Sequence, residues 1–491
     1  PPEEEHMAAK SQKMYIDGKW VDAAGGQTFE DLNPYTAEPY AHIPAGSAED
    51  ARSAIDAAKA AFPEWAATPP AAKRQIFLKA ADVMESRQDE LVQAMMEEVG
   101  GTIGIAMFQM IFVPGLLRTA AGAAYDVKGE IIPADHANSF FMALRQPAGV
   151  VACFAPFNVP YILGSRSFTI PIAYGNTAVL KPSEDAPVTG GILLAEIFEE
   201  AGLPPGVLNV VTGTREAAEE IGDEMISNPA VRRVSFTGST EVGRIVGEKA
   251  GRHLKRAVLE LGGKDPLIIL ADADLDYALD AAVWGAFLHQ GEICMSTERI
   301  IIEKGIAKEF TEKLKERAES LPMGDPTDPA TAIGPLINQR AVDKVHTQVE
   351  EAVAAGANLV TGGRHDNLVY HPTVVSEVTR DMQLFREQTF GPVAPIVVVD
   401  DAEEALAVAN DSDYGLSAGI LTSDFNRALD MAMRLETGMV HIGDQTVNDE
   451  PQAPFGGVKG SGYGRFGGQA ALDEFTELRW INVQRVPRTF P

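Results

Sequence analysis

Cys294 is one of only two cysteines among the 491 residues of this chain. It lies in the segment 290–297, QGEICMST, where its neighbours are mostly small or polar. The thiolate is the nucleophilic form of cysteine, and a free thiol with a pKa near ~8.5 is mostly protonated at neutral pH. A nucleophile here would need an oxyanion donor, a base and an acceptor for what leaves. The alternative is a small half-buried residue at the end of a helix.

Two other segments carry side chains suited to those tasks. Asn158 lies in the segment 156–160, PFNVP, and its amide could donate to a developing oxyanion, an interaction of roughly 3 kcal/mol. An Asx turn is the alternative. Glu260 lies between two leucines in the segment 259–264, LELGGK, where burial would raise its pKa and suit it to act as a general base. A salt bridge from Glu260 to Lys264 is the competing structural interpretation.

Two further segments could bind a dinucleotide. Lys181 and Glu184, in the segment KPSE, offer a donor and an acceptor for ribose hydroxyls, although a solvated turn is the alternative. The segment 236–243, FTGSTEVG, runs from a strand into a helix whose free N–H groups favour a phosphate, although it could be a plain Ser/Thr-capped helix start. A G-x-G-x-x-G pattern at 462–467 is followed by too few residues for a nucleotide-binding βαβ unit and is interpreted as a glycine-rich loop.

Short apolar runs separated by helical stretches place these segments at strand ends. The first series covers 150–154, 177–180, 207–211, 233–236, 257–259 and 267–270, and the second covers 299–302, 357–360, 393–399, 419–421 and 439–442. Continuously apolar strands that alternate with helices are typical of parallel sheets buried on both faces. The sequence therefore predicts two α/β domains joined near residues 261–265. Ligands gather outside the carboxyl ends of such strands.

The remaining segments have different patterns. Residues 14–44 alternate apolar and polar residues and predict short strands, and the pair Ser47 and Asp50 predicts the capped start of a helical region that extends to about residue 125. The segments 131–144 and 477–491 are strand-like and fit neither domain. A strand far from its own domain often completes a sheet in a neighbouring subunit, so these segments suggest an oligomer.

The composition excludes some classes of function. The net charge of −29 argues against nucleic acid or an anionic membrane as partners, since both need a basic face. We find no apolar run that approaches the roughly 18–20 residues of a membrane span, and no secretory signal. Two cysteines cannot form a disulfide framework, and no Cys/His spacing typical of a metal site is present. We expect a cytoplasmic enzyme with no metal.

Together these segments resemble the NAD(P)-dependent aldehyde dehydrogenase superfamily. The similarity covers about residues 14–487, and its motifs are PFNVP at 156–160, FTGSTEVG at 236–243, ELGGK at 260–264, G-x-x-C at 291–294, FGP at 390–392 and PFGG at 454–457. The resemblance implies that Cys294 is the nucleophile and that Glu260 is the general base. It also implies an oxyanion hole formed by Asn158 and the backbone N–H of Cys294.

The resemblance also implies a set of cofactor-binding residues, which are Pro156, Phe157, Lys181, Ser183, Glu184, Gly238, Ser239, Gly243, Leu261, Gln388 and Phe390. Lys181 and Glu184 would hold the adenosine ribose, and residues 238–243 would meet the pyrophosphate. Phe390 would flank the nicotinamide ribose, and Phe157 and Phe455 would flank the channel for cofactor and substrate. We expect NAD rather than NADP, because the Glu184 carboxylate would repel a 2′-phosphate.

The implied fold is α/β and aldehyde-dehydrogenase-like, with two doubly wound parallel-sheet domains and a bridging β-flap for oligomerisation. The NAD-binding domain would comprise residues 7–124 and 148–262, the catalytic domain 263–458, and the flap 125–147 and 476–491. The implied partners are a small-molecule aldehyde and further copies of the chain, as a homodimer or a homotetramer.

The implied chemistry begins with attack of Cys294 on the aldehyde carbon, followed by hydride transfer to the nicotinamide. The resulting thioester would be hydrolysed to the carboxylic acid by water that Glu260 activates. Relatives that pass the thioester to coenzyme A generally lack this base, so Glu260 favours hydrolysis over a CoA-acylating or phosphorylating reaction. Another alternative is a non-catalytic relative that retains the fold, which the retained Cys294, Glu260 and Asn158 oppose.

The substrate prediction rests on the segments 289–300 and 456–467, which are most similar to the branch that oxidises aromatic aldehydes such as benzaldehyde, vanillin and salicylaldehyde. Oxidation of an aliphatic aldehyde or semialdehyde by the same mechanism is the alternative. Arg166 and Phe455 are the candidate substrate residues. Arg166, two turns beyond Asn158, would favour phenolate or carboxylate substituents, unless it is a surface arginine.

Three positions depart from the family pattern. Gln388 stands where the family usually has Glu, Glu292 stands where Gln is frequent before the cysteine, and Gly443 replaces a common Asn. A Gln at 388 can still hydrogen-bond a ribose hydroxyl, but without charge.

Overall fold

A computed structural model of the chain describes residues 9–490. Its first large sheet has the strand order β22-β12-β11-β8-β9-β10-β2-β3. The five parallel strands at its centre are β8 (Val150–Ala155), β9 (Thr177–Pro182), β10 (Leu208–Val210), β11 (Val231–Thr237) and β12 (Arg256–Glu260). The strands β22 (Gly462–Tyr463), β2 (Met14–Ile16) and β3 (Lys19–Val21) form antiparallel edges. The winding reverses between β8 and β11, which opens a crevice at their carboxyl ends.

Both faces of this sheet are buried. Val151 and Cys153 of β8 face one core, formed with α2 (Pro70–Ser86), α3 (Gln88–Val99), α4 (Ile103–Ala123), α5 (Pro160–Ala173) and α6 (Leu193–Glu200). Val150 and Ala152 face a second core, formed with α1 (Ala48–Ala67), α7 (Ala218–Ser227) and α8 (Thr240–Arg252). The predicted capping box is present at the start of α1, where Ser47 and Asp50 bond reciprocally. This burial explains the continuously apolar strands.

The expectation that no apolar run approaches the length of a membrane span is wrong, because helix α4 is long and apolar enough. It has 21 residues and carries one charged side chain, Arg118, so by length and composition it could span a bilayer. In the structure α4 packs against α2, α3 and α5, and residues such as Ile105, Leu116 and Leu117 are buried in the first core. It is therefore packed as a core helix.

The second large sheet has the order β15-β18-β19-β14-β13-β20-β21. Its strands are β13 (Asp265–Ile269), β14 (Thr297–Glu303), β15 (Asn358–Thr361), β18 (Thr373–Ser376), β19 (Val393–Val399), β20 (Gly419–Leu421) and β21 (His441–Ile442). The helices α9 (Leu275–Phe287) and α10 (Lys304–Glu319) cover one face, and α11 (Gln339–Ala354), α13 (Ala402–Asn410) and α14 (Phe425–Arg434) cover the other.

Three sequence-based predictions need correction here. The run 267–270, assigned to the first series of strands, belongs to β13 in the second sheet. The run at 357–360 forms β15, which pairs antiparallel with the unpredicted strand β18 rather than parallel. The glycine pattern at 462–467, predicted to be a loop, begins with β22, which pairs with β12.

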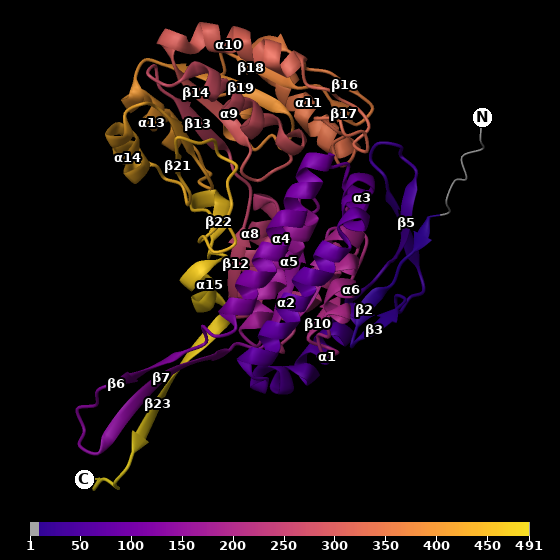
Figure 1. Ribbon diagram of the computed structural model, residues 1–491, viewed down its shortest axis with the longest axis vertical. Helices are drawn as coiled ribbons and strands as arrows, with labels where there is room; N and C mark the ends of the chain where they lie inside the picture. Colours follow the sequence, from indigo (N-terminus) through magenta and orange to yellow (C-terminus); the bar gives the residue numbers. More distant parts are fainter. Residues whose placement is uncertain (1–8, 491) are drawn as a thin grey trace.

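A three-stranded flap projects away from both sheets, at the lower left of Figure 1. It consists of β6 (Gly129–Ile132), β7 (Ser139–Pro147) and β23 (Thr476–Gln484), all antiparallel, with Trp480 opposite Ala143. The strand-like prediction for 477–491 is too long, because β23 ends at Gln484. The predicted domain ranges stay a prediction, and their ends at residues 7–8 and 491 lie outside the described residues.

Smaller elements complete the described chain. A three-stranded sheet of β1 (Lys10–Ser11), β5 (Pro39–Pro44) and β4 (Thr28–Leu32) lies beside the helices of the first core, and β16 (His365–Asp366) pairs with β17 (Val369–Tyr370). Short helices are η1 (Val188–Ile192), η2 (Leu288–Gly291), α12 (Gln383–Arg386), η3 (Lys459–Ser461) and α15 (Gly468–Phe475).

Candidate active site

A cavity of about 760 Å³ lies at the carboxyl ends of β8, β9, β11 and β12. Its opposite wall is formed by residues from segments 337–344 and 388–390, which belong to the part of the chain that forms the second large sheet. It collects most of the residues predicted from sequence. Those that line it are Pro156, Phe157, Asn158, Lys181, Ser183, Glu184, Gly238, Ser239, Glu260, Leu261, Cys294, Gln388 and Phe390. Gly243, Arg166 and Phe455, although predicted for the same site, lie outside this lining.

Cys294 lies in the loop between η2 and β14, and its side chain is partly exposed at the cavity wall. Burial raises the pKa of the Cys294 thiol, and the carboxylates of Asp265 and Glu260 add to this effect. The thiol is therefore protonated at neutral pH in this geometry, and it needs a base before it can react. The other cysteine, Cys153, is wholly buried in β8 and cannot meet a substrate.

Asn158 lies in the loop that follows β8, immediately before α5 begins at Pro160. Its side chain is buried, and its Nδ2 donates to the main-chain carbonyl of Glu292 at 2.8 Å. That bond connects the amide directly to the loop that bears Cys294. An amide nitrogen has two N–H groups, so one remains for an oxygen in the cavity.

Glu260 ends β12 and is fully buried, and neither of its carboxylate oxygens has a hydrogen-bond partner among the described residues. Burial raises the pKa of Glu260 well above its usual value, and Arg166 and Arg465 oppose that shift. The interpretation that Glu260 forms a salt bridge with Lys264 is wrong, because the Lys264 ammonium lies 2.7 Å from Glu298 instead. The backbone of Gly456 lies close to the Glu260 carboxylate, because a Cβ added at Gly456 would be only 2.6 Å from a Glu260 oxygen.

The far end of the cavity presents a buried cation and a helix start. Lys181 is buried at the end of β9, and the only hydrogen bond that its Nζ makes among the described residues is to the Pro182 carbonyl, at 3.3 Å. Burial lowers the pKa of Lys181. Ser239 caps α8 by accepting from the N–H of Val242, and both residues line this end of the cavity. A solvated turn at Lys181 is thus excluded.

Glu184 is paired at the cavity rim. Its carboxylate lies 2.6 Å from the guanidinium of Arg215, which also lines the cavity. The negative charge predicted to repel a 2′-phosphate is therefore accompanied by a positive charge that would attract one.

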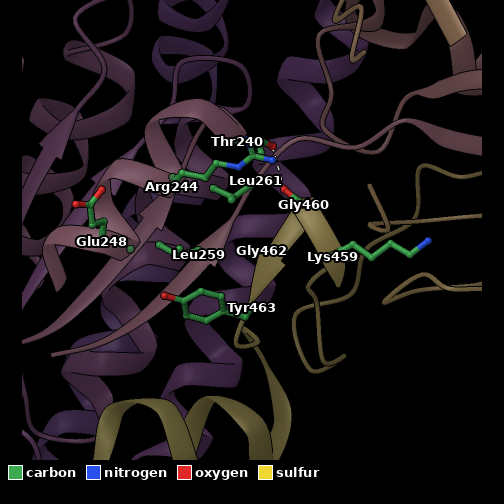
Figure 2. A pocket seen from close by; sticks show the side chains of 11 residues that line it. Thr240, Arg244, Glu248, Leu259, Leu261, Lys459, Gly460, Gly462 and Tyr463 are labelled. Carbon is green, nitrogen blue, oxygen red and sulfur yellow. Dashed lines mark hydrogen bonds between the residues drawn. The ribbon is translucent and has the colours of Figure 1, made fainter. Parts of the chain in front are cut away.

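Gly243 borders a different space. It lines a smaller cavity of about 280 Å³ between α8 and residues 459–463. Figure 2 shows the side chains that line it, with that of Arg244 reaching toward Thr240 and Gly460. A Cβ at Gly243 would collide with the Leu261 side chain. The glycine therefore lets α8 pack closely against Leu261.

Residues 388–390 are held by a carboxylate that the sequence interpretation missed. The Glu298 carboxylate accepts from the backbone N–H groups of Thr389 at 2.7 Å and Phe390 at 2.8 Å, and it also pairs with Lys264. Phe390 has a left-handed backbone, with φ 59°, and its ring meets that of Phe157 edge-on at 6.1 Å. Gln388 leaves its buried Nε2 without a partner among the described residues.

Arg166 is buried in α5 rather than exposed, so the surface alternative is wrong. Its guanidinium lies 2.5 Å from the Asp449 carboxylate and stacks between two rings, 4.6 Å from the centre of Phe455 and 5.4 Å from that of Phe112. Both charges act on Cys294 and Glu260, whose pKa values each respond to Arg166 and Asp449.

Several residues of the site were not found from sequence. Asp449, Arg215 and Glu298 carry no local signal, because each is defined by a partner that the fold brings from elsewhere. His289 carries no local signal either, because its partner, the Asn158 main-chain oxygen, lies 131 positions away in the chain. Within residues 9–490, no group of three or more His, Cys, Asp or Glu side chains could hold a metal ion.

The arrangement matches a known family. The family model described as the aldehyde dehydrogenase family matches residues 20–481, which is nearly the whole chain. The chain belongs to the aldehyde dehydrogenase family. It is accordingly an oxidoreductase that acts on the aldehyde group, and the resemblance inferred from its motifs is confirmed.

Individual aldehyde dehydrogenases are similar over the full length. Vanillin dehydrogenase of Pseudomonas sp. strain HR199 is 47% identical over 97% of this chain and 99% of its own. A benzaldehyde dehydrogenase [NAD(+)] of Pseudomonas putida is 42% identical, covering 97% of each chain. The crystal structure of a salicylaldehyde dehydrogenase from Pseudomonas putida G7 complexed with salicylaldehyde superposes with a TM-score of 0.96, at 41% identity, over 98% of this chain and 100% of that chain. The predicted aldehyde dehydrogenase fold is confirmed.

Proposed function

We propose that this aldehyde dehydrogenase oxidises an aromatic aldehyde to the carboxylic acid, with NAD as cofactor and Cys294 as nucleophile. The observation that carries the proposal is that one cavity brings Cys294, Asn158 and Glu260 together with Lys181 and the start of α8. A thiol, an oxyanion donor, a base and a phosphate-type helix end are the parts that this reaction requires.

The residues at the far end of the cavity fit a dinucleotide. Lys181 is a buried ammonium without an ion pair, so a ribose hydroxyl would supply the acceptor that it lacks. The N–H groups after Ser239 suit a pyrophosphate, and the unpartnered amide of Gln388 suits the second ribose. Bound NAD would accept the hydride.

The protein's own residues account for the other steps. Cys294 loses its thiol proton to water in the open cavity and adds as the thiolate to the aldehyde carbon, and the free Asn158 N–H and the Cys294 main-chain N–H stabilise the oxyanion. After oxidation the thioester remains on Cys294. Glu260, whose carboxylate has no competing protein donor, then takes a proton from water, which attacks the thioester and releases the acid.

The substrate side of the site favours an aromatic ring. The Arg166 guanidinium lies over the rings of Phe112 and Phe455, and its charge acts on the pKa of the Cys294 thiol. Because Asp449 already neutralises Arg166, the site suits a neutral ring rather than a phenolate or carboxylate. The relatives named for vanillin, benzaldehyde and salicylaldehyde support the same class.

One assay tests this proposal. We expect NADH formation from NAD and benzaldehyde in the absence of coenzyme A and phosphate, and no NADH from Cys294→Ala. Cys153→Ala is the matched control, because that thiol is buried and does not line the cavity. A higher kcat/KM for a short aliphatic aldehyde than for benzaldehyde or vanillin would contradict the aromatic assignment. A requirement for coenzyme A would contradict the hydrolytic mechanism.

The flap supports self-association into a homodimer or homotetramer. Leu478 and Trp480 on β23 and Ile131 on β6 are 62%, 66% and 68% exposed, although each is large and apolar. Such a surface needs a cover, and a second copy of the chain is the proposed one. We expect Trp480→Glu to lower the mass measured by sedimentation velocity, whereas an unchanged mass would contradict this role. A reducing cytoplasm, where both cysteines stay free thiols, is part of the proposal.

A further inference from the structure

The loop before Cys294 has an unusual backbone. Three consecutive residues, His289, Gln290 and Gly291, have left-handed φ values of 50°, 55° and 72°. Only glycine adopts this conformation without cost, so two of the three positions are strained. The Gln290 side chain anchors the turn by donating to the carbonyls of Gly100 and Pro335 at 3.2 and 3.0 Å.

From this turn the His289 ring reaches the Asn158 main chain. Its Nε2 lies 2.6 Å from the main-chain oxygen of Asn158, and the ring is fully buried. Burial lowers the pKa of His289 to about 4, so the ring is neutral at the pH of the reaction. A carbonyl can only accept, so the single ring proton is on Nε2. Nδ1 has no partner among the described residues.

One short loop, residues 289–292, therefore contacts Asn158 through both its main chain and its side chain. Its main-chain oxygen accepts from His289, and its side-chain Nδ2 donates to the carbonyl of Glu292, which lies two residues before Cys294. The two contact residues are themselves connected, because the backbone N–H of Glu292 donates to the His289 carbonyl at 2.9 Å. The distance between the amide and the thiol is therefore set by the loop and not by the two side chains alone.

We infer that His289 is a positioning residue for the aldehyde oxidation, because its Nε2–H holds the Asn158 main chain so that the Asn158 amide meets the oxyanion formed at Cys294. This inference rests on the proposed role of Asn158. His289 acts through Asn158 and takes no proton from the substrate. A misplacement of about 1 Å near the chemistry can reduce a rate on the order of 100-fold, which gives the scale of the expected effect.

The test uses single-turnover formation of NADH, with enzyme in excess over benzaldehyde, so that the rate reports steps up to the thioester. His289→Gln keeps an N–H donor, since its Nε2 is the same number of bonds from Cβ as the histidine Nε2. We expect it to stay within about 3-fold of the unmodified enzyme. His289→Phe keeps a ring without the donor, and we expect a loss of about 10- to 100-fold with an unchanged KM for NAD.

Two further variants distinguish positioning from folding. His289→Gly removes the donor but accepts the left-handed backbone, and we expect the same loss as for His289→Phe. His346→Phe is the matched control, because that histidine contacts Tyr370 in the second large sheet's region and lies outside the cavity lining. A normal rate for His289→Gly, or an equal loss for His289→Gln, would overturn the inference.

A double mutant separates this inference from the proposed function. Asn158→Ala should itself lower the single-turnover rate, and adding His289→Phe should then cost less than about 3-fold more, because the group it positions is gone. Fully multiplicative losses would show that His289 acts by another route. A normal rate for Asn158→Ala alone would instead refute the oxyanion role of Asn158.

Discussion

Replacing Glu260 by glutamine should separate the two halves of the reaction. The change keeps the shape of the side chain and removes its ability to take a proton. Neither carboxylate oxygen has a protein donor among the described residues, so the substitution breaks no hydrogen bond within the protein. It also removes a buried ionisable group, and we expect no loss of folding stability.

The magnitude follows from the role of a general base, which typically contributes 10²- to 10⁴-fold, or about 2.7 to 5.5 kcal/mol of activation free energy. We expect Glu260→Gln to lower the steady-state rate by roughly that factor. The first turnover should survive, because the thioester forms before water is activated. Stopped-flow measurement should therefore show a burst of about one NADH per active site, followed by slow turnover.

The pH dependence gives a second measurement. A base works when deprotonated, and burial raises the pKa of Glu260, so kcat of the unmodified enzyme should rise with pH through that raised pKa. Glu260→Gln should lose this rise. The control is Glu316→Gln on the exposed face of α10, which should change neither rate. A full steady-state rate in Glu260→Gln would refute the base role, and a lost burst would show that Glu260 is already needed to activate Cys294.

Two further predictions concern Glu184 at the cavity rim and Glu292, two residues before Cys294 in the chain. Glu184→Ser should raise kcat/KM for NADP relative to NAD by at least about 10-fold, because it frees Arg215 to bind a 2′-phosphate, and adding Arg215→Ser should reverse the gain. Glu292 is fully buried and its pKa is raised by burial, so the folded protein holds a proton that the unfolded chain releases above about pH 4.5. Stability should fall as pH rises above that value, by at most about 1.4 kcal/mol per pH unit, and Glu292→Gln should remove the fall. Thermal unfolding of the unmodified protein and of Glu292→Gln at pH 5 and pH 8 measures this fall in stability. If the difference in Tm between the two proteins were the same at both pH values, the prediction would be wrong.

The strand ends could be predicted from sequence because burial on both faces produces continuous apolar runs. Asn158, Lys181, Gly238 and Glu260 each follow such a run, and the parallel order of the strands brings them to one edge. The position of these residues at a strand end could be predicted because the apolar run that marks the strand lies directly before each of them in the sequence.

The partners of buried charges could not be predicted, because they depend on register between distant strands. Lys264 precedes β13 and Glu298 lies in β14, and the pairing of Asp265 with Thr297 places the two side chains together. A partner four residues away in sequence was the obvious alternative, and it was wrong. The alternative that Arg166 is a surface residue was wrong for a similar reason, since its partner Asp449 lies 283 positions further along the chain.

Glu298 explains how the site accommodates Gln388. The backbone of Thr389 and Phe390 is fixed by two charge-assisted hydrogen bonds to Glu298, four residues beyond Cys294 in the chain. Residues 389 and 390 are thus oriented by β14, which begins three residues after Cys294, and not by the side chain at 388. Under the proposed function, a neutral amide at 388 would change one hydrogen bond to the cofactor, while Glu298 keeps the loop in place relative to the thiol. Asn158 and the loop at 388–390 are therefore both held by the same short stretch of chain around Cys294, the first through Glu292 and the second through Glu298.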